Sequence, residues 1–338
     1  MYPDVIRIGI PLLIVAVLIL HVIPAPRKKD YTGGVRTGAM SLVSTLPVYR
    51  KIYRRSRILL FIYELFLIAA IVSTLFLIAR PYEVKKGATD ELLNEWIEIL
   101  GRGFSRGKGY TVSAMKKTVS EICRTFSEIK VKKVEKVKVA VIGELYLKYS
   151  VPGNNHLEEF LTEQDCEYFI PTVFGFGAYK TNGALEDLRT YGGHPIKRLI
   201  MEAVMKYYFF IEDLLISGIE KWPMFTAPER VNDLKKRAEG IIDTTNSMGE
   251  GWYLAAEMLE LADHGYENII CVQPFGCLPC HVAVKGMQNK VRRVNPKINS
   301  VDIEYDPGAT KVNQENRIKL MLAVARENLH KDAENKGE

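Results

Sequence analysis

The chain has 338 residues, of which 47% are apolar and 25% charged, with 25 Gly and 15 Pro. This composition excludes a disordered tail, a collagen-like repeat and a disulfide-stapled mini-domain, and the length suffices for a sizeable core. The net charge of +6 is local, because residues 25–57 hold nine Lys or Arg and one Asp, a net +8 that leaves −2 for the rest. The body of the protein is therefore not a basic nucleic-acid binder, and we expect no nucleic-acid partner.

Two apolar stretches flank the basic segment. Ile8–Ile23 is uncharged and would span about 24 Å as a helix, whereas Ile58–Ala79 would span about 33 Å and carries only Glu64. These stretches predict a two-helix transmembrane hairpin over residues 1–80, with 25–57 as its basic loop. Because Lys and Arg concentrate in cytoplasmic loops, the charge pattern puts the rest of the chain on the other side of the membrane.

Beyond residue 80 the composition is that of a soluble domain in which helices and strands alternate. Residues 81–136 read as a helical lead-in, with helices at 89–100 and 114–129. β-Branched runs predict strands at Lys138–Ile142, Tyr168–Val173, Asn268–Gln273 and Ser300–Tyr305. Apolar periodicity predicts further helices at 157–164, 196–220, 230–244, 252–263 and 313–329. The alternation predicts an α/β domain with a parallel sheet over 137–330, a helical insertion at about 195–260 and a polar tail at 331–338.

In parallel sheets, ligands bind beyond the carboxyl ends of the strands, where the loops gather. The loops expected there begin at Gly143, Pro171, Pro274 and Asp306. They hold most of the polar and thiol side chains that merit attention in this sequence. The topology therefore predicts the place of a site without naming a reaction.

Five stretches of the soluble part are distinctive. They read RPYEVKKGATD (80–90), KVAVIGELYLKYSVPGNNHLEEFL (138–161), MGEGWYLAAEMLEL (248–261), NIICVQPFGCLPCHVAVKGM (268–287) and DIEYDPGATKVNQENRIKLML (302–322). Together they resemble the C-terminal half of the 2-hydroxyacyl-CoA dehydratase family, in the branch associated with the CoA-substrate-specific enzyme activase. The resemblance implies a Rossmann-like half-module that contributes to a cysteine-ligated iron–sulfur site. Such a site accepts an electron from an ATP-driven activator and dehydrates a 2-hydroxyacyl-CoA through a ketyl radical.

The cysteines supply the candidate cluster ligands. Cys277 and Cys280 form a C-x-x-C, a spacing shared by metal sites and redox dithiols, and thiolates are the ligands of iron–sulfur clusters. The resemblance assigns Cys277 as a ligand, whereas relatives often carry Asn at the position of Cys280, which makes Cys280 the weaker candidate. Cys123, Cys166 and Cys271 lie in predicted helices, strands or their edges and read as structural. Two thiols without a metal remain the alternative.

The other candidate site residues are polar. Glu250 and Glu144 are candidate catalytic carboxylates, and Asn154, Asn155 and Asp306 are candidate substrate-binding residues. Each has a local alternative: helix capping accounts equally well for the asparagines and for Glu250, and an Asp-Pro-Gly turn needs no ligand.

The chain departs from the family in its N-terminal part. The half that supplies further cysteine ligands is missing, so one chain has an incomplete ligand set. Residues 32–81 instead resemble the membrane anchor of bacterial von Willebrand factor A-domain proteins, although no DxSxS metal motif follows. The two resemblances meet at Ala79–Pro81, which leaves a chimera open. The family also implies a cytoplasmic domain, opposite to the side that the charge pattern indicates.

Three functions therefore stay open. The first is an iron–sulfur, dehydratase-like component, a lyase that acts on an acyl-CoA with a partner half or an ATP-dependent activase. The second is a non-catalytic, membrane-tethered binding or assembly module. The third is a chimeric fusion without physiological activity.

Overall fold

The computed structural model describes residues 75, 78–105, 112–132, 134–306 and 308–337. The predicted spans at 8–23 and 58–79 and the basic loop 25–57 lie outside the described residues, apart from Leu75, Ile78 and Ala79. Among the helices that the structure does describe, none combines the length and the apolar character required to cross a bilayer.

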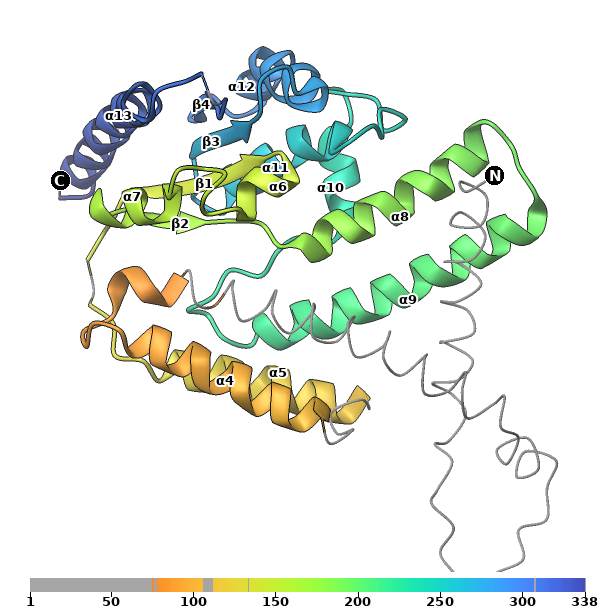
Figure 1. The fold of residues 1–338 in the computed structure, drawn as a ribbon, viewed down its shortest axis with the longest axis horizontal. Helices are drawn as coiled ribbons and strands as arrows, with labels where there is room; N and C mark the ends of the chain where they lie inside the picture. Colours follow the sequence, from red (N-terminus) through yellow and green to blue (C-terminus); the bar gives the residue numbers. More distant parts are fainter. Residues whose placement is uncertain (1–74, 76–77, 106–111, 133, 307, 338) are drawn as a thin grey trace, which may run out of the picture.

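A parallel sheet of four strands forms the centre of the α/β domain (Figure 1). Its strands are β1 (Lys138–Gly143), β2 (Glu167–Phe169), β3 (Asn268–Gln273) and β4 (Asn299–Glu304), in the order β2-β1-β3-β4. The predicted parallel α/β sheet is therefore confirmed. β2 is shorter than expected, because it ends at Phe169 and a helix already begins at Val173.

Helices cover both faces of the sheet, and alternate residues of β1 divide between two cores. Val139 and Val141 pack with α7 (Leu157–Glu163) and α13 (Lys311–Gly337) on one face. Ala140 and Ile142 pack with α11 (Gly251–Asp263), the π-helix η2 (Cys280–Lys285) and α12 (Gln288–Val294) on the other. This alternation follows from the two-residue period of a strand, and burial on both faces explains why β1 is apolar from Val139 to Ile142.

The part of the chain that follows β2 and precedes β3 forms helices, and the long ones extend beyond the sheet. α8 (Val173–Thr190) and α9 (Pro195–Ile219) run side by side beyond the sheet, and α10 (Val231–Ala238) packs on α11 (Figure 1). α4 (Ala88–Ser105) follows the short η1 (Arg80–Tyr82), and α5 (Val112–Ser127) packs against α9. The helical lead-in thus joins the core through α9.

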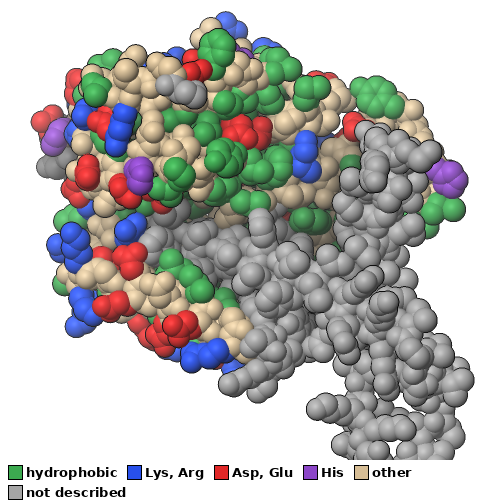
Figure 2. Space-filling view, viewed as in Figure 1, with side chains coloured by type: hydrophobic (Ala, Val, Ile, Leu, Met, Phe, Trp, Pro, Cys, Tyr) green, Lys and Arg blue, Asp and Glu red, His purple; other side chains and the backbone are tan. Residues whose placement is uncertain are grey.

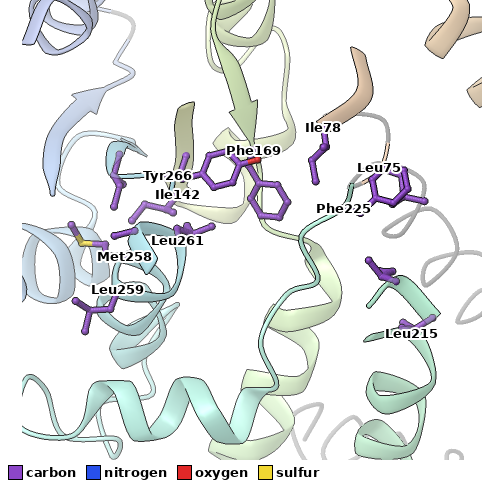
Figure 3. Packing of buried hydrophobic residues seen from close by; sticks show 14 of the residues in the cluster. Leu75, Ile78, Ile142, Phe169, Leu215, Phe225, Met258, Leu259, Leu261 and Tyr266 are labelled. Atoms are coloured by element: carbon purple, nitrogen blue, oxygen red, sulfur yellow. The ribbon is translucent and has the colours of Figure 1, made fainter. Parts of the chain in front are cut away.

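One buried cluster connects the sheet with the helical part. The rings of Phe169 and Tyr266 are tilted by 40° with centroids 5.4 Å apart, in the same cluster as Ile142 of β1. The same cluster continues to Leu215 of α9 and to Leu75 (Figure 3). The end of the predicted second span therefore contributes side chains to this core.

The sequence analysis did not foresee α6 (Leu145–Tyr149), α8 or α12. α6 and α12 are short, and α8 carries Gly175, Gly177 and Gly183, which lower its intrinsic helix propensity. The glycines have a packing reason: a Cβ on Gly177 would lie 2.7 Å from the Tyr208 hydroxyl, so glycine lets α8 approach α9 closely.

Candidate functional site

The strand order has its switch point at the carboxyl edge between β1 and β3, and we call this edge the crevice. The chain leaves β1 toward β2 on one side and reaches β3 on the other, so the loops after β1 and β3 diverge at this point. Gly143 ends β1 with φ +116°, and a Cβ there would collide with the carbonyl oxygen of Val272. The next amide, Glu144 N–H, donates to that same oxygen at 2.8 Å. Glycine is therefore required where the loop turns over the end of β3.

Two carboxylates lie at the start of helices beside this crevice. Glu144 accepts a hydrogen bond from Leu147 N at 2.9 Å and so caps α6. Glu250 is buried, and its Oε1 accepts from Leu145 N at 3.1 Å. Glu250 makes no side-chain cap to its own helix α11, so the capping alternative does not describe it. Its carboxylate instead joins the start of α11 to the start of α6.

The turn that carries Glu250 packs directly on the cysteine loop. Lys180 donates to the carbonyl oxygens of Ser247 at 3.2 Å and of Gly249 at 3.0 Å. Gly249 has φ +57°, and a Cβ there would collide with the Pro279 ring. Positive φ at Gly249 thus allows the Glu250 turn to approach the C-x-x-C closely.

Three thiols meet behind this loop. Cys277 is half-buried, Cys280 is fully buried, and their Sγ atoms lie 3.3 Å apart. Burial raises the pKa of Cys277 to about 12, and the Glu250 carboxylate adds to that rise. A hydrogen bond with Cys271, together with burial, raises the pKa of Cys280 even further. With pKa values raised this far, both thiols are neutral at pH 7.

Polar residues beyond the cysteines connect the ends of β3 and β4. His281 Nδ1 lies 2.7 Å from the carbonyl oxygen of Cys277 and thus donates to it. Lys285 donates to Glu304 Oε1 at 2.8 Å, which lowers the pKa of Glu304, and Gln273 donates to the same oxygen at 3.1 Å. The sequence analysis did not single out Lys285 or Glu304. Lys285 ends η2 and Glu304 ends β4. A charged residue at the carboxyl end of a strand is the sequence signal that could have indicated Glu304.

The three candidate substrate-binding residues have partners within the chain. Asn154 donates to Leu147 O at 2.9 Å and accepts from Leu157 N at 3.2 Å, so it stabilises α6 and α7. Asn155 donates to Gln314 Oε1 at 2.8 Å. Asp306 accepts from Gly308 N at 2.6 Å, as the turn alternative predicts. Asp306 shares the carboxyl edge with Cys277, because β3 and β4 are parallel neighbours.

The cysteines of this chain fit part of a cluster site. Iron–sulfur clusters are held by several thiolates, and no three His, Cys, Asp or Glu side chains in the described part of the chain are arranged to hold a metal ion. Two sulfurs on one tetrahedral metal would lie roughly 3.8 Å apart, given metal–sulfur bonds of about 2.3 Å. The observed Sγ–Sγ distance is shorter, 3.3 Å, and Cys280 is fully buried whereas Cys277 is half-buried. Cys277 is thus the more accessible of the two thiols, and a cluster at this position would need further ligands from elsewhere.

Comparison with known protein families, curated proteins and solved structures finds no match to this chain. The dehydratase resemblance therefore rests on the sequence stretches given above.

Proposed function

We propose that this chain is a membrane-tethered half-module of an iron–sulfur, 2-hydroxyacyl-CoA dehydratase-like lyase. The observation that carries the proposal is a half-exposed thiol, Cys277, beside a buried carboxylate, Glu250, at the carboxyl edge of a parallel sheet. The sequence resemblance supports the same assignment, and the predicted hairpin at 1–80 supplies the tether.

An apolar rim supports docking of a partner half. Met248, Phe275 and Leu278 are 68%, 76% and 58% exposed, and they belong to the two loops that carry Glu250 and Cys277. Figure 2 shows hydrophobic side chains gathered on the visible face of the α/β part. Exposed apolar groups around a polar centre are typical of a surface that another protein covers. The partner half would supply the missing ligands and a share of the acyl-CoA site, and an ATP-dependent activase would deliver the electron.

Each residue has a distinct part in this proposal. Cys277 is the cluster ligand, and Cys280 becomes a second ligand only if its thiol moves away from Cys271. A bound cluster supplies one-electron chemistry at this edge. Glu250, oriented by the Leu145 amide, is the candidate proton-transfer group, and Glu144 is the second carboxylate at the crevice.

The test is cluster reconstitution on the full chain in detergent, under anaerobic conditions with ferrous iron and sulfide. The reaction contains an external thiol, which supplies the ligands that the partner half would provide. We expect bound iron and acid-labile sulfide under these conditions, and we expect Cys277→Ser to abolish this binding. The matched control is Cys123→Ser, because Cys123 is buried in α5, away from the crevice. A colourless, iron-free protein, or iron that Cys277→Ser leaves unchanged, would contradict the proposal. That outcome would favour the binding module or the chimera instead.

A further inference from the structure

A pocket lies at the end of β2, and its wall contains neither Cys277 nor Glu250. Its cavity volume is about 40 Å³, and it opens to solvent between the end of β2, α9 and α11. Five polar side chains line it: Thr172, Glu212 of α9, Glu229, and Tyr253 and Glu260 of α11. The remaining wall is mainly apolar and includes Phe169, Leu215, Ile216, Ile219 and Pro228.

Glu212 carries an unsatisfied oxygen in this pocket. The residue is only 5% exposed, and its Oε1 accepts from Val231 N at 3.0 Å. Its Oε2 is buried and has no hydrogen-bond partner among the described residues. An unpaired buried carboxyl oxygen costs free energy. A ligand that donates a hydrogen bond to Oε2 would remove this cost.

Glu260 adds a second carboxyl group that lacks a counter-ion. It is 6% exposed, and its Oε1 accepts from Glu229 N at 2.7 Å. Neighbouring acids are neutralised: Arg237 pairs with Glu229 at 2.6 Å, and Arg230 pairs with Asp213 at 2.6 Å. Among the described residues, neither Glu212 nor Glu260 forms an ion pair. Glu212 and Glu260 are therefore acidic groups of the pocket wall that no described cation pairs directly.

Burial sets the charge state of these carboxyls. It raises the pKa of Glu212 to about 7 and that of Glu260 to about 8. The charged groups that face Glu212 are Asp213 on its own helix and Arg230 and Asp233 from the packed segment; those that face Glu260 are Glu257, Glu229 and Arg237. A cationic ligand would favour ionisation of both carboxyls and would gain affinity from it.

We propose that this pocket binds a small organic amine whose ammonium group donates to Glu212 and Glu260 and whose apolar body packs on Leu215 and Ile219. The acidic groups disfavour an anion. A divalent cation such as Ca²⁺ requires six or more oxygen ligands, whereas these walls are mainly apolar. This inference is independent of the cluster proposal, because the pocket and the crevice share none of the residues used above.

The test is isothermal titration calorimetry of the full chain in detergent with three probes of similar shape: cyclohexylamine, cyclohexanol and cyclohexanecarboxylate. Detergent without protein is the blank. We expect the amine alone to bind, with affinity that rises at least tenfold between pH 6 and pH 9 as the carboxyls ionise. Binding should also release protons, so that the measured heat depends on the ionisation enthalpy of the buffer.

Two variants locate the binding site. Glu212→Gln should lower the amine affinity at least tenfold, whereas Glu202→Gln, on the same helix but outside the pocket wall, should leave it unchanged. Glu260→Gln is the second variant if Glu212→Gln fails to fold, as judged by its thermal transition. No amine heat above the blank, equal binding of cyclohexanol, or unchanged affinity in both Gln variants would overturn the proposal.

Discussion

A single carboxylate, Glu250, connects two helices that begin at the edge of the sheet. Its Oε1 accepts the Leu145 amide while its own turn is held by Lys180. A buried carboxylate that accepts a backbone amide orders both loops of the crevice. The structural role requires only an oxygen that accepts the Leu145 amide, whereas the proposed proton transfer requires an ionisable carboxyl group. Substitution by Ala and by Gln separates the two roles.

Glu250→Ala should lower the free energy of unfolding by about 1–3 kcal/mol, because the Leu145 amide loses its buried acceptor. Glu250→Gln keeps an acceptor oxygen and should cost less than about 1 kcal/mol. Chemical denaturation of the two variants measures the difference. Equal losses in Ala and Gln would show that the amide contact does not stabilise the edge.

Glu260 makes stability depend on pH. Its pKa is raised to about 8 in the folded chain, whereas an unfolded glutamate titrates near 4.3, so the folded state holds a proton that the unfolded state has lost. The contribution of this group is therefore present at low pH and is lost as pH rises from about 5 to about 8, by at most about 1.4 kcal/mol per pH unit.

Glu260→Gln should flatten this decline, because the amide does not ionise. The measurement is a set of denaturation curves between pH 5 and pH 8, and Glu239→Gln, at an exposed position, is the matched control. Parallel pH profiles for the wild type and Glu260→Gln would contradict the assignment.

At the scale of elements, the strands were predictable and several helices were not. β3 occupies its predicted bounds and β4 is displaced by one residue, because β-branched runs bounded by polar or glycine residues are local signals. α8 was missed, because its glycines are read locally as loop residues. Their reason is tertiary: Gly175 faces the Tyr253 hydroxyl of α11, a contact between residues distant in sequence.

A double-mutant cycle tests this contact. Gly175→Ala gains helix propensity of about 1 kcal/mol but brings its Cβ into collision with the Tyr253 hydroxyl, so we expect a net loss of about 1–3 kcal/mol. Tyr253→Phe removes that oxygen. In the Phe background, Gly175→Ala should therefore cost little or should stabilise. Additive effects in thermal or chemical denaturation would exclude the close approach of α8 and α11.

At the scale of the molecule, parallel topology made the site's place predictable but not its contacts. The carboxyl edge gathers the loops of Glu144, Cys277 and Asp306 because parallel strands end there. The bond from Leu145 to Glu250 joins residues over a hundred positions apart, and sequence spacing carries no signal for it. The sequence analysis did not select Glu212 for another reason. It lies within the apolar stretch of α9, whose pattern predicts core packing.

The central claim is that one thiol, Cys277, is presented at the edge of the sheet while Cys280 is buried. Alkylation of the iron-free full chain, followed by mass spectrometry of each cysteine, tests this claim most directly. Cys277 should react first, at a rate that rises about tenfold per pH unit through pH 10, because its thiol pKa is raised to about 12. Cys123, Cys166, Cys271 and Cys280 are buried and should react only on unfolding. Protection of Cys277 equal to that of Cys280, or faster reaction of Cys280, would contradict the account.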